Sequence, residues 1–107
     1  MDETKFKIEK YIEILRQQLN IELIIIFGSY LKDSYSRDSD IDILVVASEF
    51  SRMSKLDAYK ILSRPMWDLK INIDPIPATP EEVQEYDRAS FLAEVMNTGK
   101  IVYQKSA

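Results

Sequence analysis

The chain contains no cysteine and no histidine among its 107 residues. Without cysteine it can form no disulfide and offers no thiolate nucleophile. Without histidine it lacks the base of the Ser-His-Asp and Cys-His triads, and the two absences together exclude zinc sites built from these residues. Any chemistry must therefore use carboxylates, hydroxyls, lysine, arginine and a bound metal ion.

Long apolar runs and an excess of positive charge are absent as well. No stretch approaches the ~20 apolar residues that a membrane span needs, and Lys5, Glu9 and Glu13 interrupt a signal-peptide pattern. The 14 basic and 18 acidic residues give a net charge of −4, which argues against non-specific binding to duplex nucleic acid. We therefore expect a soluble, cytoplasmic protein with no membrane partner.

The length and the hydrophobic fraction of 46% predict one globular domain over residues 1–107. Apolar residues at helical spacing predict a first helix from Asp2 to about Leu19. Apolar and β-branched runs predict three strands, over 22–27, 41–47 and 69–74. On the second strand, even-numbered and odd-numbered residues should occupy opposite faces.

The second half of the chain carries clear signals for where elements begin and end. Pro65 is expected to close a helix over 55–63, and the run from Thr79 to Glu82 predicts a helix start with a capping box. A further helix is expected over about 90–96, followed by a short strand over 101–103. This order favours an α/β fold with helices layered on a sheet, and it leaves open which strands run parallel.

The clearest functional pattern is Gly28-Ser29, ten intervening residues and then Asp40-Ile41-Asp42, directly after the apolar run 22–27. Side chains two apart on a strand point the same way, so Asp40 and Asp42 should project together. Paired carboxylates suit hard divalent cations, which take oxygen ligands. A glycine without Cβ lets the backbone approach a phosphate closely. The pattern predicts a nucleotide–Mg²⁺ site.

A third carboxylate would complete a two-metal site, in which the ions lie ~3.5–4 Å apart. Asp74 is the best candidate, because it faces away from Ile71 and Ile73 and is followed by Pro75, which is expected to stop the third strand there. Taken alone, each of these features has a plainer explanation as a turn or a strand end. Their joint occurrence, in this order and at three predicted strand ends, favours the site.

At these residues the chain resembles the minimal nucleotidyltransferases of the DNA-polymerase-β-like superfamily, over nearly its whole length. Their signature is a strand ending in Gly-Ser, a short loop, and Asp-x-Asp opening the next strand, and it is matched here from Phe27 to Leu44. Residues 72–77 and the helix start at 79–82 are similar to the family's third-carboxylate strand and the helix after it. The resemblance implies a compact, palm-like α/β fold with a small mixed sheet flanked by helices.

The resemblance also implies a reaction and roles for single residues. The reaction would transfer a nucleotidyl group, AMP from ATP, to an acceptor hydroxyl with the help of two Mg²⁺ ions. Asp40 and Asp42 would bridge the two metals, and Asp74 would hold the catalytic metal and help to deprotonate the acceptor. The nucleotide would be bound by Gly28, Ser29, Lys32 and Ser39. Such a site suits phosphoryl transfer, which rests on positioning and charge neutralisation.

The expected partner follows from size. Larger members of the superfamily add an acceptor-binding domain for which this chain is expected to have no room, so a separate protein should present the acceptor. Chains of this size resemble the antitoxins of HEPN/MNT toxin–antitoxin pairs, in which the nucleotidyltransferase adenylylates a tyrosine of the HEPN ribonuclease. Two alternatives stay open: a catalytically weak or inactive module that acts by binding its partner, and a small-molecule nucleotidyltransferase whose acceptor site spans a homodimer.

Several residues bear on this choice. Tyr30 and Asp33 favour the binding module, because relatives often carry Arg and Gly at these places, whereas the intact set of three carboxylates favours the enzyme. Tyr30 either stacks on a base or covers the core, and Lys32 and Arg37 either meet phosphate or are solvated. Five large side chains are assigned to the core in preference to a partner interface: Ile14, Phe50, Met53, Met66 and Trp67.

Overall fold

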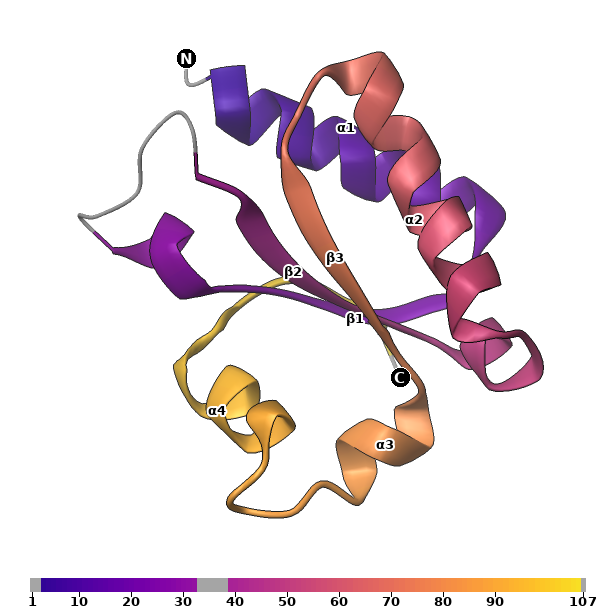
Figure 1. The fold of residues 1–107 in the computed structure, drawn as a ribbon, viewed down its shortest axis with the longest axis vertical. Coiled ribbons are helices and arrows are strands. Elements are labelled where there is room, and N and C mark those ends of the chain that lie inside the picture. Colours follow the sequence, from indigo (N-terminus) through magenta and orange to yellow (C-terminus); the bar gives the residue numbers. More distant parts are fainter. Residues whose placement is uncertain (1–2, 33–38, 107) are drawn as a thin grey trace.

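A computed structural model of the chain describes residues 3–32 and 39–106, so Asp33 and Arg37 lie outside the described residues. Its centre is a four-stranded sheet in the order β3-β2-β1-β4 (Figure 1). β1 runs antiparallel to β2 and β4, whereas β2 and β3 run parallel. The strands are β1 (Ile21–Phe27), β2 (Ile41–Ala47), β3 (Ile73–Ala78) and β4 (Lys100–Gln104). This mixed sheet confirms the predicted α/β fold.

Helices cover both faces of the sheet, with α1 and α2 on one face and α3 and α4 on the other (Figure 1). Their bounds are α1 (Glu3–Gln18), α2 (Lys55–Leu69), α3 (Pro80–Gln84) and α4 (Phe91–Thr98), with 3₁₀ turns η1 (Gly28–Leu31) and η2 (Ser48–Arg52). Among the described residues, none of these helices has the length and apolar character needed to cross a membrane.

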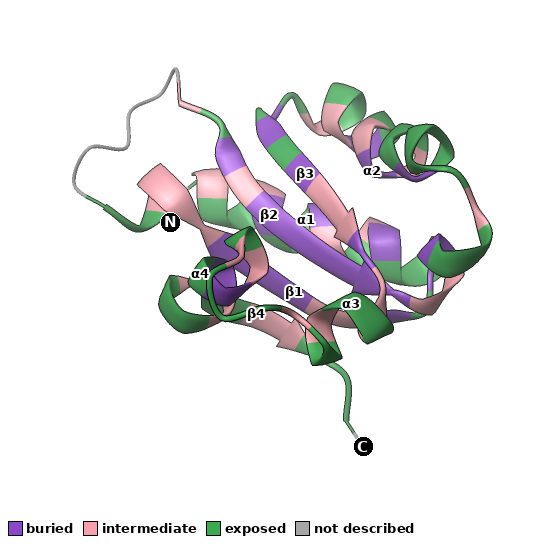
Figure 2. Cartoon of the chain, turned by 60° about the horizontal axis from the view of Figure 1, so that its bottom comes forward, coloured by how far each residue is buried: buried purple, intermediate pink, exposed green. Residues whose placement is uncertain are grey.

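The two central strands bury side chains on both faces, and Figure 2 shows the long buried stretch of β2. The odd-numbered residues of β2 from Ile41 to Val45 join the cluster beneath α1 and α2, whereas Leu44 and Val46 join the cluster beneath α3 and α4. This alternation follows from the two-residue period of a strand and confirms the predicted faces. Asp42, two residues before Leu44, therefore belongs to the α3/α4 face.

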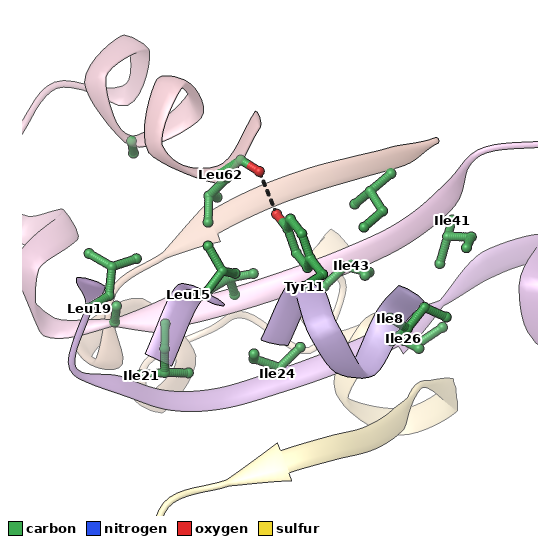
Figure 3. Packing of buried hydrophobic residues seen from close by; sticks show 14 of the residues in the cluster. Ile8, Tyr11, Leu15, Leu19, Ile21, Ile24, Ile26, Ile41, Ile43 and Leu62 are labelled. Atoms are coloured by element: carbon green, nitrogen blue, oxygen red, sulfur yellow. Dashed lines mark hydrogen bonds between the residues drawn. The ribbon is translucent and has the colours of Figure 1, made fainter. Parts of the chain in front are cut away.

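Tyr11 joins α1 to α2 within the larger cluster (Figure 3). Its side chain is fully buried, and its phenol donates a hydrogen bond of 2.7 Å to the backbone carbonyl of Leu62. Burial raises the pKa of Tyr11 above its ordinary value of 10.0, because the charged phenolate would lose its hydration. The phenol thus remains a neutral donor that holds the two helices in register.

The expected end of the second helix near Pro65 is wrong, because α2 continues to Leu69. A proline offers no N–H to the carbonyl four residues earlier, which ordinarily breaks a helix. Here Pro65 is buried, together with Ala58 and Leu62, on the side of α2 that packs against α1 and β3. Tertiary packing therefore outweighs the local penalty, and the helix ends at Lys70, which is left-handed with φ 54°.

The third strand lies later in the sequence than the expected span of 69–74, and it continues through Pro75 and Pro77. β3 is an edge strand with β2 as its neighbour. The carbonyl of Asn72 accepts a hydrogen bond of 2.9 Å from the N–H of Ile41, so the backbone of Asn72 faces β2. Since backbone groups alternate along a strand, both prolines face the open edge, where a missing N–H costs no bond in the sheet.

The helix α3, which follows β3 in the sequence, begins where its local signals predict. The Thr79 side chain accepts a hydrogen bond of 3.1 Å from the N–H of Glu82, and the Glu82 carboxylate accepts one of 2.9 Å from the N–H of Thr79. This completes the capping box. Ser90 caps α4 in a similar way, by accepting a hydrogen bond from the N–H of Ala93.

Most of the large side chains assigned to the core do lie there. Phe50 is buried, and Met53 and Met66 pack against the larger cluster. Tyr30 packs against the same cluster, which confirms that it covers the core. Ile14 is half-buried and belongs to neither buried cluster, and Trp67 is the clear exception, since 82% of it is exposed. It lies on the part of α2 beyond Pro65, where the sequence predicted no helix.

Candidate active site

Three strand ends meet at one end of the sheet, here called the carboxylate edge to distinguish it from the open edge along β3. Because β1 is antiparallel to β2 and β2 is parallel to β3, the end of β1 lies beside the beginnings of β2 and β3. In this register Phe27 lies opposite Asp42, and Asp42 lies opposite Asp74. Asp74 is therefore near the start of β3, not at a strand end as expected, and the parallel pairing is what brings it next to Asp42.

The carboxylates at this edge influence one another. Asp42 is half-buried, whereas Asp40 and Asp74 are exposed. Partial burial raises the pKa of the Asp42 carboxyl above its ordinary value of 3.8, and the charges of Asp74 and Asp40 and a hydrogen bond with Asp74 raise it further. Within the described residues, neither ion pair of the protein involves these groups. The edge is a concentration of negative charge that a bound cation would relieve.

Gly28 shapes the turn between β1 and η1. Its φ is 78°, in the left-handed region that glycine adopts without strain. A Cβ at this position would collide with the carboxylate of Asp42. Sequence reasoning assigned Gly28 to the approach of a phosphate and missed its contact with Asp42, because that contact depends on the antiparallel pairing of β1 with β2.

The other residues predicted to bind nucleotide lie around the same turn. Ser29 is half-buried, and its carbonyl accepts a hydrogen bond of 2.9 Å from the N–H of Lys32. Lys32 is exposed, and Ser39 is half-buried directly before Asp40. Their contact with phosphate stays a prediction.

A pocket of about 440 Å³, here called the α4 pocket, opens beside Asp42 on the α3/α4 face of the sheet. The rings of Phe27 and Phe91 form an edge-to-face pair, with centroids 5.4 Å apart and planes at 76°. Sequence reasoning missed the α4 side of this pocket, because α4 reaches it only by packing on β1. The lining residues are Phe27, Gly28, Leu31, Lys32, Asp42, Phe91, Glu94, Val95 and Thr98.

The donor set at the edge fits a Mg²⁺ ion. Carboxylate oxygens are preferred ligands of Mg²⁺, which in nucleotide sites is held by one or two carboxylates together with phosphates and water. The described residues contain no group of three or more His, Cys, Asp or Glu already arranged around a metal position. The adjacent carboxylates of Asp42 and Asp74 thus match an open site that a nucleotide completes.

A mixed sheet whose edge combines a Gly-Ser turn with adjacent carboxylates is typical of nucleotidyl-transfer domains. The chain belongs to the family "Polymerase beta, Nucleotidyltransferase", which matches residues 9–107. Among proteins of Methanocaldococcus jannaschii, "Putative protein adenylyltransferase MJ0141" is 33% identical over 87 residues, which cover 80% of this chain and 81% of that protein. "Putative protein adenylyltransferase MJ1305" is 26% identical over 104 residues, which cover 92% of this chain and 70% of that protein.

Solved structures share the fold over almost the whole chain. A "putative nucleotidyltransferase" from Sulfolobus solfataricus superposes with a TM-score of 0.70 at 23% identity, covering 95% of this chain and 81% of that one. A toxin–antitoxin structure with AMP-PNP gives 0.66 at 23% identity, covering 91% and 73%. The complex of tri-AMPylated Shewanella oneidensis HEPN toxin with MNT antitoxin gives 0.62 at 22% identity, covering 95% and 73%. At such identities the likeness establishes the fold alone.

Proposed function

We propose that this chain transfers AMP from ATP, with Mg²⁺, to a hydroxyl group of a partner protein. The observation that carries the proposal is the pairing of Asp42 with Asp74 in register, beside the Gly28-Ser29 turn. The family gives nucleotidyl transfer as the class of reaction, and the names of the two archaeal relatives support a protein as the acceptor.

The same proposal extends to the partner. One solved toxin–antitoxin structure of this fold holds AMP-PNP, and another contains a tri-AMPylated HEPN toxin with an MNT antitoxin. These complexes support ATP as the donor and a HEPN-type toxin as the acceptor. We therefore propose the role of antitoxin in such a pair for this chain.

In the proposed reaction the acceptor oxygen attacks the α-phosphorus of ATP. A new P–O bond forms, the bond to the β-phosphate breaks, and pyrophosphate leaves. Asp74, exposed on the edge strand, would take up the proton of the hydroxyl, while Ser29 and Lys32 would hold the leaving phosphates. Mg²⁺ held by Asp40, Asp42 and Asp74 would neutralise phosphate charge and polarise the phosphoryl oxygens.

The test uses the purified chain, ATP, Mg²⁺ and a HEPN-type protein as the acceptor, with intact-mass spectrometry of that protein. We expect the partner to gain the mass of AMP, and we expect Asp42→Asn to abolish this gain. Asp68→Asn is the matched control, because Asp68 is an exposed carboxylate on α2, across the sheet. A partner that gains no AMP contradicts the proposal. Suppression of the partner's ribonuclease activity by Asp42→Asn would instead identify a module that acts by contact.

A further inference from the structure

Gly28, Lys32 and Asp42, which the proposed function assigns to phosphate and metal, form one side of the α4 pocket, and the other lining residues have no role in those contacts. Its volume of about 440 Å³ falls within the ~300–1,000 Å³ of typical small-molecule sites. Four of its lining side chains are apolar, including both rings of the Phe27–Phe91 pair. This wall offers aromatic surface rather than a cradle for charge.

The charges on the pocket wall argue against phosphate as its occupant. Asp42 and Glu94 both contribute carboxylates, against the single cation of Lys32. A bare triphosphate chain would be repelled there unless metal ions neutralised it along its whole length. A flat group without charge would bury the same apolar surface at no such cost.

The direction of the proposed reaction points to the same occupant. Across the sheet, Asp74 on β3, Asp42 on β2 and Gly28 after β1 follow one another. In an in-line displacement the attacking and leaving oxygens lie on opposite sides of the phosphorus. With the acceptor at Asp74 and the leaving phosphates at Gly28-Ser29, the line from the attacking to the leaving oxygen runs across the strands, from β3 to the end of β1. The nucleoside must then project sideways from it, and the α4 pocket opens on that side.

We infer that the α4 pocket binds the nucleobase and ribose of the nucleoside triphosphate, with the base packed against Phe91. This inference rests on the proposed function, since it assigns the nucleoside end of the same substrate. Phe91 is 50% exposed, so part of its ring surface is free for a ligand beside its contact with Phe27. Stacking of this kind tolerates different bases, because every base presents a π-face.

The experiment compares two ligands, ATP and inorganic tripolyphosphate, both titrated by calorimetry against the full chain with Mg²⁺. Loss of an aromatic–base stack predicts that Phe91→Ala weakens ATP binding roughly 5- to 150-fold, with tripolyphosphate binding unchanged. Phe91→Leu keeps an apolar contact with Phe27 and removes the ring, so it should show the same selective loss if the alanine variant folds poorly. Asp42→Asn should weaken both ligands.

Phe6→Ala is the matched control. Phe6 is 46% exposed, close to the value for Phe91, but it lies on α1 across the sheet, so its loss should leave ATP binding unchanged. ATP binding that survives Phe91→Ala and Phe91→Leu would overturn the inference and leave the proposed function standing. An equal loss for both ligands would place phosphate, not nucleoside, in the pocket. Failure of the unmodified chain to bind either ligand would overturn both proposals.

Discussion

The two faces of the sheet are each covered by two helices, but they are built for different tasks. Among the described residues, sixteen buried side chains form the cluster beneath α1 and α2, and five form the cluster beneath α3 and α4. The second face also carries Asp42 and the α4 pocket. Burial of apolar area is the main favourable term in folding. We infer that α1 and α2 supply most of the stability, and that the α3/α4 face is free to hold a charged group and an open pocket.

The largest expected effect tests the face of the sheet beneath α1 and α2. Leu15 is fully buried on α1, so Leu15→Ala should lower the free energy of unfolding by about 2–5 kcal/mol. Urea denaturation followed by circular dichroism measures this loss. Leu56→Ala is the control, because Leu56 is 66% exposed on α2 and its removal should change stability by less than about 0.5 kcal/mol. Equal losses for the two variants would refute the division between core and surface.

The next effect joins stability to the site. Gly28→Ala would force a side chain into a left-handed backbone with φ 78°, at a cost of about 1–2 kcal/mol. The new Cβ would also displace the Asp42 carboxylate. We therefore expect both a lower unfolding free energy and the loss of Mg²⁺-dependent ATP binding. Normal ATP binding by this variant would show that the position of the carboxylate against the turn is unimportant.

A smaller effect concerns the hydrogen bond between α1 and α2. Tyr11→Phe should cost about 1 kcal/mol at neutral pH, because the carbonyl of Leu62 loses its buried donor. The raised pKa of Tyr11 adds a pH dependence: its stabilisation is complete below pH 10.0, the ordinary pKa, and is lost as pH rises further. In that range the protein should lose up to about 1.4 kcal/mol per pH unit through this group. Urea midpoints at alkaline pH should therefore converge for the protein and the variant.

The smallest effect is a gain in stability rather than a loss, and it concerns the α3/α4 face. Asp42→Asn removes a carboxylate that faces Asp74 across the strands, and relief of such like-charge pairs is worth roughly 0.2–1 kcal/mol. The variant should be more stable than the protein without metal. Added Mg²⁺ and ATP should reverse this order, because a ligand stabilises only the form that binds it. A less stable Asp42→Asn variant in metal-free buffer would contradict the picture of repulsion at the edge.

Local patterns were sufficient to predict much of this molecule. Three features depend only on residues that are close together in the sequence. They are the bounds of β2, the capping box at Thr79 and the two faces of the central strands. The misplaced ends of α2 and of the third strand had a common cause, whereas β3 starts late because α2 extends to Leu69. Pro65 and Pro75 are local breaking signals, and each is overruled by its tertiary position, one by burial in the core and the other by the open edge.

For the candidate site, too, the sequence predicted some features and not others. The spacing of Gly28, Asp40 and Asp42 in the sequence predicted a cluster that the strand register supports for Gly28 and Asp42. Asp74 was included in the predicted site as a residue at the end of a strand, which is incorrect, and it lies beside Asp42 because β2 and β3 run parallel. Phe91 and the α4 pocket had no signal in the sequence, since a half-exposed phenylalanine on a short helix is ordinary until its packing is known.

The two prolines of β3 also determine how other chains can approach the protein. An exposed strand edge usually invites another strand to pair with it, and proline is one of the residues that prevent such pairing. Pro75 and Pro77 lie on the edge strand that carries Asp74. Neither a second copy nor an extended peptide can add a strand there and cover the carboxylates. An acceptor protein of the proposed reaction would therefore have to reach the carboxylates without pairing a strand with β3.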